Sequence, residues 1–216
     1  MMKLFKFFTA GALMLGAVTV ANAQENVSNT NDMSVRFGVK GGVNFANLNG
    51  DDFGDADSRT SFHVGVLAEF PLSEMFSLQA EVLYSGQGAA RSYTVSNPLD
   101  PEFGERKDAE LQLDYINVPV LAKVYLFKGF SLEAGPQFSF LVNDEYDTDP
   151  TGNNGDSPSP LRDSLNTFEF GAVGGATFQT EMGLFAYARY NQGISDIADD
   201  VKINNSVFQI GVGFKF

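Results

Sequence analysis

Apolar residues recur at every second position along most of the chain. The segment from 204 to 216 has an apolar face, formed by Phe208, Ile210, Val212, Phe214 and Phe216. The alternate positions hold Gln209, Gly211, Gly213 and Lys215. Successive side chains of a β-strand point to opposite faces, so this period predicts a strand with one apolar side.

The same two-residue period, bounded by turn-forming residues, predicts eight strands. They lie near residues 35–45, 61–70, 75–86, 110–126, 129–142, 166–179, 183–192 and 204–216. In the fourth, the apolar phase changes between Asp114 and Ile116, which predicts a β-bulge there. The facing of the seventh is ambiguous, because Phe185 and Tyr187 share a face with Arg189.

The connections between these strands alternate in length. Residues 71–74, 127–128 and 180–182 are tight turns, whereas 46–60, 87–109, 143–165 and 193–203 are long, polar loops. An even number of strands with short turns at one rim and long loops at the other is typical of bacterial outer-membrane barrels, whose short turns face the periplasm. We therefore expect an all-β fold, an eight-stranded antiparallel transmembrane β-barrel with long extracellular loops.

The face opposite the apolar one carries nine charged residues that we expect to form a network in the lumen: Arg36, Lys40, Glu69, Glu81, Lys123, Glu133, Glu169, Arg189 and Lys215. In a soluble sandwich or a lipocalin-like barrel this face would point outward, but the 21 Phe and 7 Tyr, many near strand ends, favour a lipid-facing apolar side. An eight-stranded lumen is narrow enough for side chains to fill. Two interpretations stay open, a plugged lumen or a narrow path for ions.

The first 23 residues predict a secretory signal peptide. Lys3 and Lys6 precede an apolar run from Phe7 to Val20, and Ala21-Asn-Ala23 is a small-residue cleavage site. The alternative, a membrane-anchoring helix, would need a longer run. We expect residues 24–34 to be a short periplasmic segment, 35–216 the barrel, and the location the outer membrane of a Gram-negative bacterium.

The chain ends on an aromatic residue of a strand. We expect Phe214 and Phe216 to form an assembly signal recognised by the barrel-assembly machinery.

Composition and charge narrow the chemistry. The formal net charge of −13 disfavours nucleic-acid binding. The absence of cysteine excludes disulfides and thiol catalysis. The single histidine, His63, is in phase with the lumen face, so we expect no enzyme and no cofactor. A lipid-modifying enzyme using Ser, His and an acid is the weakest alternative.

Acidic clusters in the long loops raise the question of calcium. Four aspartates between Asp51 and Asp57 surround a glycine, but their spacing does not match an EF-hand loop, and residues 143–149 are similar. We expect solvated loops without a metal site. The expected partners are outer-membrane lipid and a protein or surface partner at the loops.

Three stretches stand out as motifs, FGVKGGVNFANL at 37–48, DYINVPVLAKVY at 114–125 and RYNQGISDI at 189–197. In this order they resemble the PorT-like family of small outer-membrane β-barrel proteins, often labelled "porin family". The resemblance implies an eight-stranded outer-membrane barrel and carries over no catalytic residue or ligand. We expect a structural or interaction role through the acidic loops, and the alternative is a narrow porin-like channel for small ions or solutes.

Overall fold

Nine strands make up the regular structure of the residues described below. The computed structural model describes residues 34–49, 57–97, 100–147, 156–157, 165–197 and 203–216. The strands are β1 (Arg36–Asn49), β2 (Asp57–Pro71), β3 (Phe76–Asn97), β4 (Asp100–Phe127), β5 (Phe130–Asp147), β6 (Asp156–Ser157), β7 (Phe168–Gln179), β8 (Leu184–Gly193) and β9 (Asn204–Lys215).

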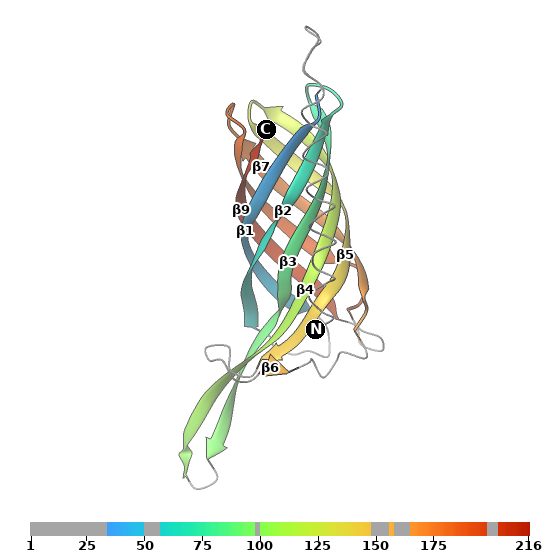
Figure 1. Ribbon diagram of the computed structural model, residues 1–216. Coiled ribbons are helices and arrows are strands. Elements are labelled where there is room, and N and C mark those ends of the chain that lie inside the picture. Colours follow the sequence, from blue (N-terminus) through green and yellow to red (C-terminus); the bar gives the residue numbers. More distant parts are fainter. Residues whose placement is uncertain (1–33, 50–56, 98–99, 148–155, 158–164, 198–202) are drawn as a thin grey trace, which may run out of the picture. The chain divides into compact units, whose positions relative to one another are not determined.

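Eight of these strands close into an antiparallel barrel, which confirms the predicted fold (Figure 1). Each barrel strand pairs with its neighbours in chain order, and β9 closes the ring by pairing with β1 from Gly38↔Lys215 to Asn49↔Asn204. The two-residue β6 pairs with the end of β5. Closure pairs the edge strands, as a barrel surrounded by lipid requires. No helix among the described residues has the length and apolarity to cross a membrane.

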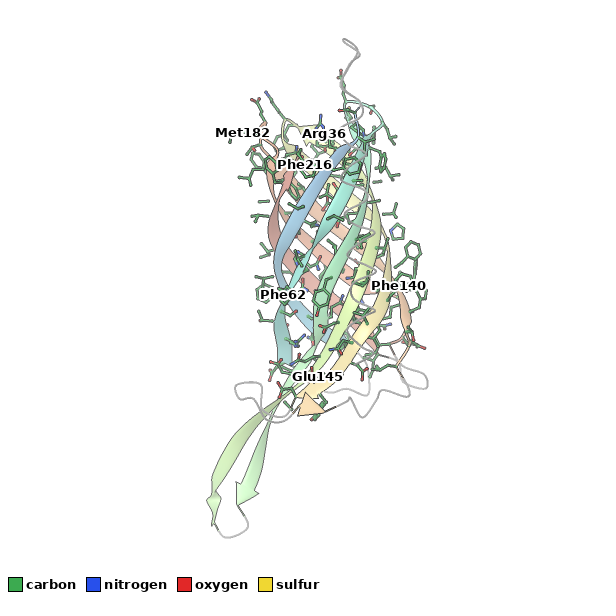
Figure 2. The ribbon with its side chains drawn as sticks, in the orientation of Figure 1. Arg36, Phe62, Phe140, Glu145, Met182 and Phe216 are labelled. Carbon is green, nitrogen blue, oxygen red and sulfur yellow. The ribbon has the colours of Figure 1, made fainter. Side chains whose placement is uncertain are left out.

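The barrel wall is apolar outside and polar inside. On β9, Val212 is 60% exposed, whereas Gln209 on the other face is 1% exposed. Phe62 and Phe140 likewise project away from the wall (Figure 2). Large apolar side chains on the outside and buried charges within are the reverse of a soluble β-protein, and they are the arrangement expected in lipid.

Short turns join the strands at one end of the barrel, hereafter the short-turn end. Residues 72–75, 128–129 and 180–183 make these connections. Gly129 has a φ of 82°, and a Cβ there would lie 2.4 Å from the carbonyl oxygen of Gln179. A left-handed backbone this close to a neighbouring strand requires glycine.

The prediction of a long loop at 87–109 is wrong. Strands β3 and β4 continue as a two-stranded ribbon, paired from Ala90↔Glu110 to Asn97↔Asp100, past the ends of the other strands (Figure 1). The first, second and fifth strands also extend beyond their predicted limits, to Asn49, back to Asp57 and to Asp147. The period-two signal arises where one face meets lipid, so it fades where both faces of a strand are polar.

Two local predictions concern the register and facing of strands. The predicted bulge is confirmed, because the β4–β5 register shifts between Asp114 and Tyr115. On β8, Phe185 and Tyr187 face inward together with Arg189.

The β9 residues opposite these rings, Gly213 and Gly211, make room for them. A Cβ on Gly213 would approach the Phe185 ring to 2.3 Å, and one on Gly211 the Tyr187 hydroxyl to 2.4 Å.

Several predictions fall outside the described residues. They are the signal peptide at 1–23, nearly all of the periplasmic segment at 24–34, and the acidic cluster at 51–57 apart from Asp57.

Candidate functional site

Charged side chains fill the middle of the barrel. Of the nine charges predicted to line the lumen, eight are at most 4% exposed: Lys40, Glu69, Glu81, Lys123, Glu133, Glu169, Arg189 and Lys215. The ninth, Arg36, is half-buried at the start of β1 and makes no ion pair with another described residue. The charged side chains therefore point into the barrel as the two-residue period of the sequence predicts.

Seven of these charges form one chain of alternating sign, hereafter the ionic chain. Its order is Lys215, Glu69, Lys123, Glu133, Arg189, Glu81 and Lys40. Every carboxylate in it has a cation on each side, and both ends are lysines. Ion pairs buried this deeply stabilise a fold only if all partners are present, because an unpaired buried charge is costly.

Arg189 joins Glu81 and Glu133 within the ionic chain. Its Nη1 and Nη2 each donate to Glu81 at 2.7 Å, and its Nε donates to Glu133. Lys123 Nζ lies 3.6 Å from a carboxylate oxygen of Glu69 and 3.6 Å from one of Glu133. Lys40 Nζ, at the end of the chain, lies 3.2 Å from Glu81 Oε2.

Neutral side chains complete the coordination of the three carboxylates. Ser77 Oγ donates to Glu69 at 3.0 Å, Thr177 Oγ1 donates to Glu133 at 3.1 Å, and Gln79 Nε2 donates to Glu81. A further donor to Glu69 is the Tyr125 hydroxyl. The carboxylates thus accept both charged and neutral hydrogen bonds, which is what a buried ionic network needs in order to persist.

His63 lies between the ionic chain and the end of the barrel opposite the short turns, hereafter the long-loop end. Its two ring nitrogens contact Asn44 Oδ1, at 2.6 Å, and the hydroxyl of Tyr187. Asn44 Nδ2 donates to Ser85 Oγ at 3.0 Å, and Gln209 Nε2 donates to Asn44 Oδ1 at 2.9 Å. Both ring nitrogens are occupied by neutral partners inside the barrel, so this histidine cannot reach a lipid outside the wall.

A polar cavity lies farther from the ionic chain, toward the long-loop end. Its volume is about 10 Å³, and its lining is Gln87, Gln137, Ser139, Glu169, Phe170, Gly171, Asn191, Gly193, Asn205 and Val207. Along β8, Arg189 belongs to the ionic chain, and Asn191 and Gly193 line the cavity. Along β9, Gln209 contacts the Asn44–His63 group, and Val207 and Asn205 line the cavity. The cavity therefore lies between the ionic chain and the long-loop end.

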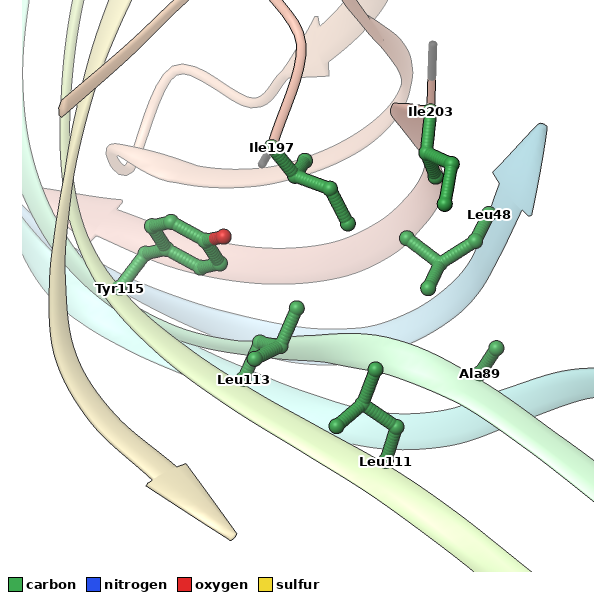
Figure 3. Packing of buried hydrophobic residues seen from close by; sticks show 7 residues of the cluster. All are labelled: Leu48, Ala89, Leu111, Leu113, Tyr115, Ile197 and Ile203. Atoms are coloured by element: carbon green, nitrogen blue, oxygen red, sulfur yellow. The ribbon is translucent and has the colours of Figure 1, made fainter. Parts of the chain in front are cut away.

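An apolar cluster lies inside the barrel at the long-loop end. Its buried members are Leu48, Ala89, Leu111, Leu113, Tyr115, Ile197 and Ile203, which face one another within the ring of strands (Figure 3). Ile197 and Ile203 lie in the β8–β9 connection, and the amide of Ile197 donates to the carbonyl of Ile203 at 2.9 Å. This cluster narrows the lumen with side chains that exclude water.

The remaining predicted residues lie at the short-turn end. Phe214 and Phe216 are exposed on the outside, and the amide of Phe216 donates to the carbonyl of Phe37 at 2.8 Å.

Lys128 and Glu181, in two of the short turns, form an exposed ion pair, whose hydrogen bond raises the pKa of Lys128 and lowers the pKa of Glu181. Exposed pairs of this kind contribute little to stability.

Among the described residues, no group of three or more His, Cys, Asp and Glu could hold a metal ion.

Sequence reasoning missed the cavity and the apolar cluster. Leu48, Ile197 and Ile203 fall in predicted loops, where no phase was assigned, whereas Leu111 and Leu113 belong to the first phase of the fourth predicted strand, ahead of its bulge. Asn191 and Asn205 carry no charge and so did not stand out beside Arg189. The inward phase of Asn191, two residues after Arg189, is the signal that could have found it.

One family model matches most of the chain. The model described as "Outer membrane protein beta-barrel domain" matches residues 22–199. A search of curated protein sequences finds no significant match.

Several solved structures are similar to this chain at low sequence identity. Neisserial surface protein A is 15% identical with a TM-score of 0.55, and the match covers 83% of this chain and 97% of that one. Ail of Yersinia pestis, solved with the heparin analogue sucrose octasulfate, is 12% identical with a TM-score of 0.49 over 85% of this chain and 100% of Ail. OprG of Pseudomonas aeruginosa is 12% identical with a TM-score of 0.45, covering 85% and 97%.

Proposed function

This chain belongs to the family of outer membrane protein β-barrel domains, and from that premise we propose that it is an outer-membrane barrel with a closed lumen that acts through its extracellular end. In such barrels the short turns face the periplasm and the long-loop end faces outward. The ionic chain is the observation that carries the proposal. Four cations and three carboxylates from seven strands bridge the interior, so solute passage would require breaking buried ion pairs.

The apolar cluster supports the same conclusion at the extracellular end. Leu111 and Leu113 from β4 meet Ile197 and Ile203 from the β8–β9 connection inside the ring (Figure 3). A hydrophobic constriction opposes the passage of hydrated ions because water does not wet it. A narrow porin-like channel, the alternative from the sequence, would need both the ionic chain and this cluster to open.

The extracellular end is the part of the molecule left to carry a function. It consists of the β3–β4 ribbon and of loops whose sequences are rich in aspartate, including 143–165 and 193–203. We propose that these loops contact a partner with a basic surface, and that lipid surrounds the barrel wall. An enzymatic role is not part of this proposal, because His63 contacts Asn44 and Tyr187 within the lumen.

Two finer assignments are also proposals. The motifs at 37–48, 114–125 and 189–197 support a place in the PorT-like branch of such barrels. Export by a signal peptide at 1–23, with Phe214 and Phe216 recognised by the barrel-assembly machinery, would deliver the chain to the outer membrane of a Gram-negative bacterium.

Single-channel recording tests the closed lumen. The refolded protein, without residues 1–23, would be inserted into a planar bilayer, and insertion would be verified by protease protection of the barrel. We expect no unitary current steps. Steady steps whose ion selectivity changes in Glu133→Gln would contradict the proposal and establish the channel alternative.

Binding to charged surfaces tests the role of the loops. The protein in lipid nanodiscs should bind polylysine-coated beads in a salt-sensitive manner and should not bind heparin-coated beads. Replacing the aspartates of 143–165 by asparagine should weaken that binding, while the same change at Glu181, at the short-turn end, should not. Equal binding to both kinds of bead, or no effect of the loop variant, would overturn the basic-partner proposal.

A further inference from the structure

The polar cavity contains a buried carboxylate without a countercharge. Glu169 is 4% exposed and accepts a hydrogen bond from the hydroxyl of Tyr115. It forms no ion pair within the part of the chain that the structure describes, whereas Glu69, Glu81 and Glu133 each have two cationic partners. A buried carboxylate without a countercharge is costly, and either a bound cation or a bound proton removes that cost.

Amide groups around Glu169 also have unused bonding capacity. Asn191 is 4% exposed, and neither its Oδ1 nor its Nδ2 has a partner among the described residues. Asn205 is equally buried; its Nδ2 donates to Gln87 Oε1, and its Oδ1 has no described partner. Buried polar atoms in native proteins are nearly always bonded to protein, water or an ion.

The size of the cavity limits what it can hold. Gly171 and Gly193 contribute no side chains to the lining, and the remaining space is about 10 Å³, close to that of a single water molecule or small ion. An organic ligand does not fit. The lining offers one carboxylate and several neutral oxygens, whereas divalent calcium sites usually combine several carboxylates.

We propose that this cavity binds one small monovalent cation, with Glu169 as the countercharge and the side-chain oxygens of Asn191 and Asn205 as neutral ligands. Gln137, Ser139 and Gln87 line the same space and offer further oxygens. The bound cation neutralises Glu169 and links strands β7, β8 and β9 on the long-loop side of the ionic chain. The site does not depend on the closed-lumen proposal, since an ion can be held in a conducting or a closed barrel.

A titration of the full chain in detergent micelles tests this proposal, with sodium as the probe. Side-chain amide signals of ¹⁵N-labelled asparagine would be followed while NaCl replaces N-methylglucamine chloride at constant ionic strength. We expect saturable shifts of the Asn191 and Asn205 signals. The signals of Asn44, whose Nδ2 already has partners, serve as the internal control and should stay in place.

Two variants make the assignment specific. Glu169→Gln keeps the shape of the side chain and should weaken sodium binding by about tenfold or more, because among the described lining residues it removes the one formal negative charge. Asp114→Asn makes the same charge change on β4 outside the cavity and should bind sodium as the parent does. Asn191→Leu should abolish the shift of Asn205 without unfolding the barrel, as judged by circular dichroism.

Three outcomes would overturn the proposal. Absence of a saturable shift in the parent protein would mean that the cavity holds water only. An unchanged affinity in Glu169→Gln, or equal shifts of Asn44, would mean a general effect of salt. Tighter binding of Ca²⁺ than of Na⁺ in the same titration would contradict the monovalent assignment.

Discussion

Removing the guanidinium of Arg189 is the most demanding test of the ionic chain. Arg189→Met keeps much of the length and apolar volume of the side chain and deletes its charge. Three hydrogen bonds disappear, two to Glu81 and one to Glu133. Glu81 keeps only Lys40 as a cationic partner, and Glu133 keeps only Lys123 at 3.6 Å.

The expected loss of folding free energy is about 3–5 kcal/mol, the range for breaking a buried ion pair by removing one partner. Each hydrogen bond to a charged group contributes roughly 1.5–3 kcal/mol. Three such bonds would sum to about 4.5–9 kcal/mol if nothing compensated, which lies mostly above the range of 3–5 kcal/mol. Lys40 and Lys123 remain near the two carboxylates, and water that enters the vacated space solvates both carboxylates. We therefore expect the loss of folding free energy to stay within the range of about 3–5 kcal/mol.

Urea unfolding of the barrel in lipid vesicles measures this loss. The chain has no tryptophan, so far-ultraviolet circular dichroism and the gel mobility of the folded form serve as probes. Adding Glu81→Gln to Arg189→Met should lower the stability further, because Glu81 is then the ion-pair partner of the buried Lys40, but by less than Glu81→Gln does in the parent chain, because the bonds from Arg189 are already gone. Lys128→Met, which breaks the exposed pair with Glu181, is the control and should leave the midpoint unchanged.

A loss below about 1 kcal/mol in Arg189→Met would refute the reasoning, because it would place these ion pairs in the range of solvated surface pairs. Strict additivity of the Arg189 and Glu81 variants would also refute it, since residues in direct contact are expected to couple.

Further predictions concern the wall, the turns and the ribbon. Val212→Lys, on the lipid face, should cost about 2–4 kcal/mol in urea unfolding if the site is near the bilayer midplane, whereas Val212→Ile should be neutral. Gly213→Ala should cost about 1–3 kcal/mol because its Cβ meets the Phe185 ring, and the smaller side chain of Phe185→Leu in the same chain should reduce that cost. Gly129→Ala should slow refolding and cost roughly 1 kcal/mol or more, as its φ is positive. Replacing 91–107 by a short turn should leave the unfolding midpoint unchanged, and a drop would show that the ribbon contributes to barrel stability.

Much of the barrel follows from local periodicity. Where one face of a strand meets lipid and the other meets the lumen, apolar and polar residues must alternate, so residues such as Val212 and Gln209 can be assigned to opposite faces without a structure. The same rule places the charges of the ionic chain inside. It fails in the β3–β4 ribbon, where neither face meets lipid and no alternation is required.

The sequence by itself therefore determined the eight barrel strands and the side to which most of their residues point, because those properties depend on neighbours two positions away. Only the tertiary structure decided which inward residues meet. Arg189 and Glu81 are 108 positions apart, and their contact depends on the stagger of strands around the closed ring. The cavity beside Glu169 likewise depends on Gly171 and Gly193, which are paired across β7 and β8. The inward rings of Phe185 and Tyr187 find room only because glycines of β9 are paired with them. Stagger is a property of all the hydrogen-bonded strand pairs together, and no single segment encodes it.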